Sequence, residues 1–354
     1  MSSHEHIERL HTHDLELGAT EAVQRHVSRH VVASKPVSQR KLDFERSRPR
    51  WLRECMAEAA GVFMYVFPGI ATTAVFTLQQ PPDAAVGSLF QIGFGYAMGI
   101  AMAIIVCAPV SGGHFNPAVT LCLAIWQGFP WRKVPMYVAS QIFGAFVAGA
   151  LMMGMYWPEI SALNKEFVAQ GKPLVGANAP ASVLCSFPLA TQTNAGFLIL
   201  TEFFADSFIG LVIWAVLDPA NPFVAPASAP FTIGFAYATM VWSFGAITIS
   251  TNLARDLGTR MVAAIFYGPT VFTYMSYSPI GILVNIPATV FATALYEFLM
   301  RDSLSMIGKG RAVHEGGEEG LRRHISRPGV LDPELGAMNS TISEKKGIKH
   351  MNGV

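Results

Sequence analysis

The sequence predicts an all-α polytopic membrane protein, with six transmembrane helices and two re-entrant half-helices in an inverted repeat. Its 354 residues are 51% hydrophobic and 14% charged, against about 25% charged residues in a typical soluble protein. Of the 25 Lys and Arg, 9 lie in residues 1–50 and 9 in residues 301–354, which leaves 7 for the 250 residues between. This middle region is therefore too apolar to face water.

Six apolar stretches are long enough to cross a bilayer, whose hydrocarbon core needs about 20 residues of helix. They span residues 55–76, 88–110, 133–157, 196–217, 226–249 and 279–300. Six crossings place both tails on one side of the membrane. The basic residues that flank the spans also fall on that side, and they are Arg48, Arg50, Arg53, Arg132, Lys133 and Arg301. The positive-inside rule therefore predicts that both termini are cytosolic.

The polar tails and the apolar middle divide the chain into three regions. We expect residues 1–50 and 301–354 to be disordered cytosolic tails, because they are polar and lack helical periodicity. Residues 51–300 form the membrane domain. Within it, residues 51–157 make up repeat one, residues 158–194 a connecting loop, and residues 195–300 repeat two.

An internal repeat supports the division of the membrane domain. Glu58 and Glu202 each lie in an opening span, and an asparagine that starts a short apolar segment follows them, 58 residues later at Asn116 and 50 residues later at Asn252. Three spans in each half give the two halves opposite topologies. Such inverted repeats place their site near the bilayer midplane, between broken helices.

The two short apolar segments, residues 115–126 and 252–267, predict the site itself. Asparagine is a preferred helix N-cap, and Pro117 suits the first helical position. Non-helical backbone at this depth is tolerated where it is buried in protein or lines a water-filled cavity. Two half-helix N-termini that meet there repel cations, whereas the asparagine amides bind neutral solutes. The predicted pore centre comprises Asn116, Pro117, Ala118, Asn252, Leu253 and Ala254.

These segments resemble the two signatures of the major intrinsic protein (aquaporin) family. The stretch SGGHFNPAVT at residues 111–120 is similar to the first signature, and NLARDLGTR at residues 252–260 is similar to the second. Asp256, directly after Arg255, resembles the aquaglyceroporin subgroup. The resemblance implies that residues 51–300 are a passive channel domain for glycerol, other small neutral solutes and water, which excludes protons and ions. It also implies a homotetramer with one pore per subunit.

The resemblance further implies a selectivity filter and one departure from the family pattern. The family's spacing places Tyr96, Met240, Ile249 and Arg255 at the constriction, and a lipid- or core-facing role remains open for Met240. This set contains no histidine, unlike the narrow water-selective channels. Leu253 stands where the family usually has proline, which places the local pore width in question.

Several polar residues are expected to stabilise the re-entrant loops. Glu58 and Glu202 should accept hydrogen bonds from backbone N–H groups of these loops, and proton relay is the alternative role of an intramembrane acid. We expect Asp256 to orient the second loop by pairing with Arg260, without touching the solute. The other predicted loop-stabilising residues are His114 and Gln141.

Other functions remain as alternatives or are disfavoured. A water-selective aquaporin is the first alternative, and an ion channel or proton-coupled transporter that uses Glu58, Glu202 and Asp206 is the second. We find no nucleophile–base pair, and the four cysteines lack metal-ligand spacing, so we expect neither an enzyme nor a cofactor or metal. The net charge of +1 argues against a nucleic-acid partner. The expected partners are the solutes, membrane lipid and other subunits, and the expected location is the plasma membrane.

Overall fold

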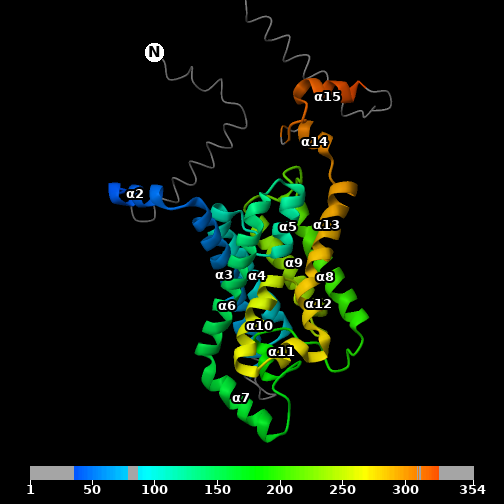
Figure 1. The fold of residues 1–354 in the computed structure, drawn as a ribbon. Helices are drawn as coiled ribbons and strands as arrows, with labels where there is room; N and C mark the ends of the chain where they lie inside the picture. Colours follow the sequence, from blue (N-terminus) through cyan, green and yellow to red (C-terminus); the bar gives the residue numbers. More distant parts are fainter. Residues whose placement is uncertain (1–35, 79–86, 309, 311, 327–354) are drawn as a thin grey trace, which may run out of the picture. The chain divides into compact units, whose positions relative to one another are not determined.

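The computed structural model of the chain describes residues 36–78, 87–308, 310 and 312–326. The chain divides into two compact units, Met1–Arg50 and Trp51–Val354. Every regular element in the described residues is a helix (Figure 1). The all-α prediction is therefore confirmed.

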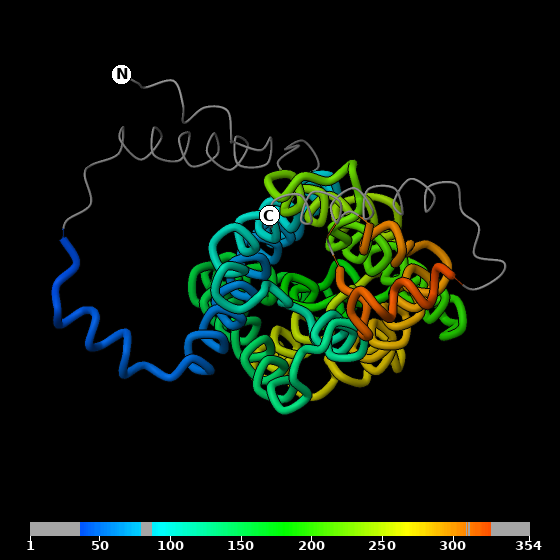
Figure 2. Tube along the Cα trace, turned by 90° about the horizontal axis from the view of Figure 1, so that it is seen from above, coloured from blue at the N-terminus to red at the C-terminus, as the bar shows by residue number. Residues whose placement is uncertain are grey.

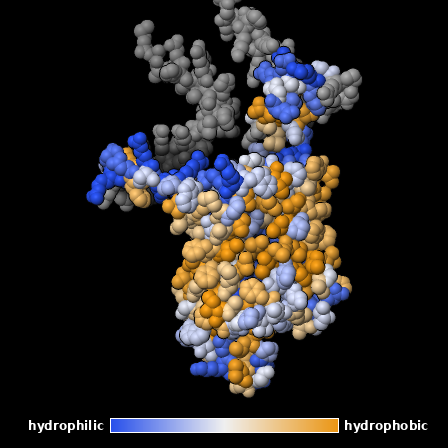
Figure 3. Space-filling model, in the orientation of Figure 1, coloured by the Kyte–Doolittle hydropathy of each residue, from blue (hydrophilic) through white to orange (hydrophobic). Residues whose placement is uncertain are grey.

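Five helical stretches in the described residues are long and apolar enough to cross a membrane. They are α3 (Arg50–Leu78), α4 (Leu89–Ser111), η1 with α6 (Trp131–Lys133 and Val134–Met155), α8 (Ala195–Leu217), and α12 with α13 (Ser278–Leu283 and Asn285–Leu299). Exposed apolar side chains form a broad band across the face of the bundle that Figure 3 shows. A wide apolar belt of this kind fits a lipid environment rather than water.

The sixth span, α9 (Ala229–Phe244), is shorter than the predicted stretch of residues 226–249. After the helix the backbone bonds to other segments: the Ile249 carbonyl accepts from Ser186 Oγ at 2.8 Å, and Ser250 N donates to Glu202 at 2.8 Å. α9 lies along α4, its counterpart in the first half. The six-span fold with two re-entrant segments is thus complete, although one span has only 16 helical residues.

The two re-entrant half-helices are α5 (Pro117–Trp126) and α10 (Leu253–Tyr267). In Figure 1, α5 lies near the upper end of the bundle and α10 near its lower end. α10 packs along α6, and α5 packs against α13 and α6. Viewed from above, the helices are arranged around the centre of the bundle (Figure 2).

The connection predicted as a loop over residues 158–194 contains two helical segments, which corrects the prediction. They are α7 (Trp157–Ala169) and η2 (Pro180–Val183). α7 carries Pro158 and Glu159 in its first turn and ends before Gly171, whose φ is +66°. Proline, an acid at the N-terminus and a left-handed glycine after the C-terminus are ordinary helix-end signals. Two further short helices, α11 (Thr270–Thr273) and η3 (Tyr274–Ser276), follow α10.

The expectation of tails without helices is also wrong for the segments that the structure describes. The tails contain α2 (Gln39–Ser47), α14 (Ser303–Gly308) and α15 (Gly317–Ile325). Ser38 caps α2, and α15 places acids in its first turn and bases in its last turn. Local capping and dipole effects thus support short helices that carry too few apolar residues to show periodicity. Tail residues 1–35, 309, 311 and 327–354 lie outside the described part of the chain.

Candidate functional site

Asn116 and Asn252 each begin a half-helix as its N-cap. The Asn116 side-chain oxygen accepts from Ala118 N at 2.9 Å. The Asn252 oxygen accepts from Ala254 N at 2.9 Å and from Arg255 N at 3.2 Å. These bonds satisfy backbone donors that the first turn of a helix leaves without partners. They also fix each amide nitrogen to point away from its own helix.

The two half-helices meet tip to tip through reciprocal hydrogen bonds. Asn116 Nδ2 donates to the Thr251 carbonyl at 3.2 Å, and Asn252 Nδ2 donates to the Phe115 carbonyl at 2.9 Å. Each asparagine thus bonds to the residue that immediately precedes the other one. Both asparagines line the same cavity of about 60 Å³. The structure therefore brings the predicted pore centre together.

The backbone before each asparagine is non-helical and takes the left-handed conformation at its last residue. Phe115 has a φ of +49° and Thr251 a φ of +61°. L-residues rarely adopt this region, and such strain persists only where the surroundings impose it. Here the strained backbone belongs to the two residues whose carbonyls accept hydrogen bonds from the asparagine amide groups.

Glu58 holds the first re-entrant loop with both of its oxygens. Oε1 accepts from Ser111 Oγ at 2.6 Å and from His114 N at 3.0 Å. Oε2 accepts from Phe115 N at 2.8 Å and from Gln141 Nε2 at 2.7 Å. The carboxylate is fully buried, so these four donors replace its hydration. This geometry corresponds to the loop-stabilising role expected for Glu58 and Gln141.

Glu202 holds the second loop with one oxygen. Its Oε1 accepts from Ser250 N at 2.8 Å and from the Tyr277 hydroxyl. The backbone bond corresponds to the one Glu58 makes in the first loop. The Tyr277 contribution has no signal in the sequence repeat, because Tyr277 comes from the segment before α12.

His114 lies in the first loop as a packed side chain. Its Nδ1 lies 3.2 Å from Thr120 Oγ1, and its ring packs against Phe129 and Tyr137 with centroids 4.5 and 4.8 Å away. Gln141 Nε2 donates to the same Thr120 hydroxyl at 3.0 Å. His114 therefore fixes the loop against α5 and α6, as a loop-stabilising residue does.

Arg255 forms a constriction with Tyr96. Its Nε and Nη2 donate to the Tyr96 hydroxyl at 3.2 and 2.7 Å, and its Nη1 donates to Ser186 Oγ at 3.2 Å. Arg255 and Tyr96 border a cavity of only about 40 Å³, which Val241 and Ile249 also line. The guanidinium is therefore held against one wall, and Val241 and Ile249 contribute aliphatic groups to the lining.

Met240 is not part of this constriction. It is 7% exposed, belongs to the hydrophobic core, and lines none of the cavities described here, whereas Val241 lines the constriction. On a helix, adjacent residues differ by about 100° in direction, so an error of one position moves a side chain from lumen to core. Val241 is the α9 residue of this stretch that lines the cavity beside Arg255.

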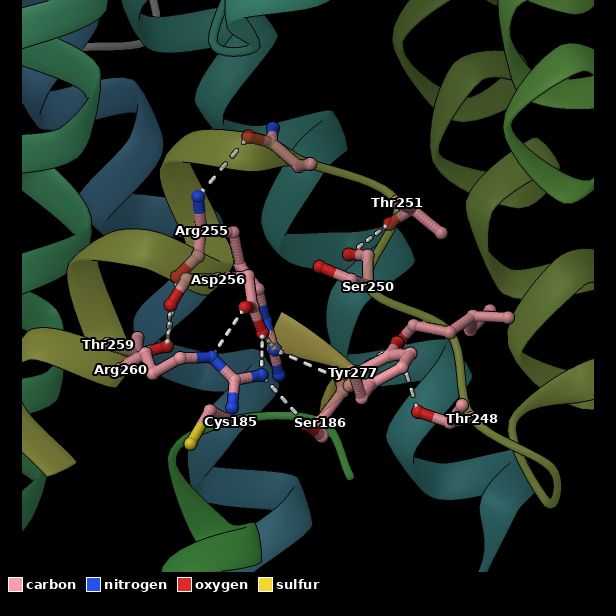
Figure 4. Close-up of polar contacts among 12 residues, drawn as sticks. Cys185, Ser186, Thr248, Ser250, Thr251, Arg255, Asp256, Thr259, Arg260 and Tyr277 are labelled. Carbon is pink, nitrogen blue, oxygen red and sulfur yellow. Dashed lines mark hydrogen bonds and ion pairs between the residues drawn. The ribbon is translucent and has the colours of Figure 1, made fainter. Parts of the chain in front are cut away.

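Asp256 and Arg260 form a buried ion pair behind the constriction (Figure 4). Arg260 Nε and Nη2 donate to the two Asp256 oxygens at 2.8 and 2.9 Å. Arg260 also donates to the carbonyls of Val271 at 2.6 Å and Ser186 at 2.8 Å. The pair predicted from the sequence is present, and neither residue lines the cavities. It fixes the segment whose Ser186 hydroxyl contacts Arg255.

Comparisons with known proteins identify the family. A sequence model described as major intrinsic protein matches residues 45–280. The chain belongs to the major intrinsic protein family. It is 38% identical to Aquaporin-3 of Laccaria bicolor over 306 residues, which cover 85% of this chain and 92% of that protein. It is 36% identical to Aquaglyceroporin-2 of Rhizophagus irregularis over 251 residues, which cover 70% of this chain and 77% of the relative.

A solved structure supports the same fold. The X-ray structure of the aquaglyceroporin from Plasmodium falciparum matches with a TM-score of 0.60 and 23% identity, and the match covers 73% of this chain and 99% of that one. As a member of the major intrinsic protein family, the chain is a multi-pass membrane channel and not an enzyme.

Three cavities of the aquaporin-family channel share lining residues and lie in succession. A vestibule of about 430 Å³ shares Tyr96, Val241, Ile249 and Arg255 with the constriction. The constriction shares Asn252 and two tyrosines with the central cavity. A solute passing along them meets the arginine first and the asparagines second.

The two tyrosines, Tyr65 and Tyr237, were missed by the sequence reasoning. The Tyr237 hydroxyl accepts from Asn116 Nδ2 at 3.4 Å. Tyr237 lies four residues, about one helical turn, before Val241, so the two side chains share a face of α9 and the position of Val241 also predicts that of Tyr237. Ser186 carries no such signal, because only tertiary folding brings its segment to Arg255.

Proposed function

We propose that the chain is a passive channel for glycerol and other small neutral solutes together with water, and that it excludes protons and ions. The amphipathic constriction supports this proposal. Arg255 and the Tyr96 hydroxyl present polar groups on one side, and Val241 and Ile249 present aliphatic groups. A polyol has the matching character, with hydroxyl groups along one edge of a carbon chain.

The exclusion of charge rests on the pore centre. The N-termini of α5 and α10 meet there, and each carries about half a positive charge from its helix dipole. An asparagine amide carries two N–H donors, and Asn252 Nδ2 uses one on the Phe115 carbonyl. The other is available for a solute oxygen. A water molecule bound in this way donates its hydrogens outwards, which interrupts a proton-conducting chain.

Further features support the glycerol assignment, the oligomeric state and the membrane location. A relative of 36% identity carries the name Aquaglyceroporin-2, and Asp256 follows Arg255 as in that subgroup. The family resemblance supports a homotetramer with one pore per subunit. The basic residues that flank the spans support cytosolic termini in a plasma membrane.

The experiment is transport in proteoliposomes that contain the purified full chain. Light scattering follows water loss under an osmotic shock and then reswelling as glycerol enters. Both rates should exceed those of empty liposomes, and a pH-sensitive dye inside should report no added proton flux. Fast water flux with a background glycerol rate would favour the water-selective alternative. Proton or ion current would favour the transporter alternative.

A matched pair of variants on adjacent residues tests the constriction. Val241→Ile adds one methylene to the lumen wall and should lower glycerol permeability by roughly tenfold, the lower range for one methylene in a fitted site. Water permeability should fall less, because water is smaller. Met240→Leu conserves volume in the core and should leave the water-to-glycerol ratio unchanged. Equal effects of the two variants would contradict the filter assigned here.

A further inference from the structure

A second buried acid, Asp206, lies behind the second half-helix, and the proposed transport does not involve it. Asp206 follows Glu202 by four residues on α8, so both side chains share one helix face. Each is 1% exposed. The Glu202 carboxylate accepts a hydrogen bond from the backbone N–H of Ser250, and the Asp206 carboxyl group lies beside Asn285 at the start of α13.

Asp206, its neighbours Glu202 and Asn285, and Ser250, which bonds to Glu202, carry buried oxygen atoms without hydrogen-bond partners. Within the described residues, these atoms are both Asp206 oxygens, Glu202 Oε2, Asn285 Oδ1 and Ser250 Oγ. Only the Ser250 hydroxyl is a donor, and the other four accept when the acids are ionised. No lysine or arginine in the described part of the chain forms an ion pair with either acid. The cluster therefore has one donor for four acceptors, and it lacks a compensating positive charge.

A single proton supplies a second donor and removes one charge. We infer that Asp206 is a neutral carboxylic acid in the folded channel, and that its hydroxyl donates to Asn285 Oδ1 and so positions the Thr251 carbonyl at the pore centre. Asn285 Nδ2 donates to the Thr251 carbonyl at 3.0 Å, which turns Asn285 Oδ1 away from that carbonyl. The same carbonyl accepts from Asn116 Nδ2 at 3.2 Å. Asp206 thus acts on the pore through Asn285, as a positioning residue.

The proton belongs on Asp206 rather than on Glu202 because their partners differ. Glu202 Oε1 accepts from Ser250 N and from the Tyr277 hydroxyl, and both bonds stabilise a carboxylate. Asp206 has the side chain of Asn285 beside it, and neither Asp206 oxygen has a partner that meets hydrogen-bonding geometry among the described residues. Burial without such bonds favours the uncharged form of an acid. The ionisable groups that face Asp206 are Glu202 on its own helix and Tyr237 on α9.

Infrared spectroscopy of the reconstituted full chain tests the protonation state without relying on transport. At neutral pH, the wild type should show the C=O band of a protonated carboxyl group, and Asp206→Asn should lose it. Glu166→Gln, a change of an exposed acid on α7, is the control and should keep it. The inference is overturned if the wild type lacks the band, or if Asp206→Asn retains it while Glu202→Gln loses it.

Water flux then tests the positioning role, which rests on the proposed pore. Asp206→Asn keeps the shape and a donor for Asn285, so its water permeability per folded channel should stay close to wild type. Asp206→Val fills the site without a donor and should cause a several-fold loss. A Val variant that folds and conducts normally would overturn the positioning role. If the wild type conducts no solute, the proposed function fails while the infrared result still decides the state of Asp206.

Discussion

The two re-entrant loops reach the same geometry with different side chains. Both place a left-handed residue before an N-cap asparagine, and both use a buried glutamate from the opening span of their half. Glu58 accepts four hydrogen bonds and uses both oxygens, whereas Glu202 accepts two on one oxygen. Four residues after each glutamate, the first half has Val62 and the second has Asp206.

The half-helices differ in the same way. Asp256 and Arg260 lie four and eight residues after Asn252, and the corresponding residues after Asn116 are Thr120 and Ala124. The first half-helix is thus held by neutral groups around one saturated carboxylate. The second is held by an ion pair and an acid cluster. The repeated backbone geometry therefore does not require repeated side chains, and equivalent substitutions in the two halves should differ in their effects.

The largest effect is expected for Asp256→Ala, which removes the ion pair found in the second half only. Arg260 is 1% exposed and would keep its charge without the carboxylate. Loss of one partner of a buried pair costs about 3–5 kcal/mol. We expect a large fall in the apparent melting temperature of the purified protein, which fluorescence-detected size-exclusion chromatography measures. Glu319→Ala breaks the exposed Arg323–Glu319 pair on α15 and should change little. Equal shifts for the two variants would contradict this account.

The next prediction compares the loss of stability when each of the two glutamates is changed to glutamine. Glu58→Gln puts an amide N–H₂ among four donors, so at least one charge-assisted bond worth about 1.5–3 kcal/mol is lost. Glu202→Gln places its amide at the Oε2 side, which accepts no bond among the described residues and faces the acid cluster. We therefore expect a clear loss of thermal stability for Glu58→Gln and a smaller one for Glu202→Gln. The reverse order would show that the second loop depends more on its glutamate than the first.

Hydropathy and helix-start chemistry predicted most of the fold. The span positions follow from apolar length, and α5 and α10 follow from Asn116 and Asn252 at the start of apolar segments. The meeting of the two asparagines follows from the inverted repeat. α7 was missed because its residues are mixed in polarity, so that only its end signals mark it.

The parts of the site that were missed depend on tertiary contacts. Ser186 reaches Arg255 from 69 positions away in the chain, and no local pattern encodes that contact. Met240 was assigned in place of Val241 because counting from Asn252 crosses residues 245–251, which are not helical. Spacing along a regular helix predicts a face, whereas spacing across irregular backbone does not.

A smaller effect is expected for Gly113→Ala in the first loop. Gly113 and Gly128 both have a φ of +71°, but a Cβ at Gly113 would lie 2.6 Å from Ala108 Cβ, and one at Gly128 meets nothing within 4 Å. Both variants carry the left-handed penalty of about 1 kcal/mol. Only Gly113→Ala adds a clash, so its melting temperature should fall further than that of Gly128→Ala. Similar shifts would mean that the first loop moves to accommodate the methyl group.

The smallest effect is expected for Leu253→Pro. This change places a proline at the first position of α10, where α5 already has Pro117. A proline requires the preceding residue to be extended. Asn252, with φ −157° and ψ 117°, already matches Asn116, with φ −147° and ψ 127°. The first N–H of a helix has no intrahelical acceptor, so we expect a stability change below about 1 kcal/mol. Leu253 lines none of the three cavities, and the water and glycerol rates should therefore change only modestly. A large loss of either rate would show that the leucine side chain sets the pore width, and that the two half-helix tips differ in function as well as in sequence.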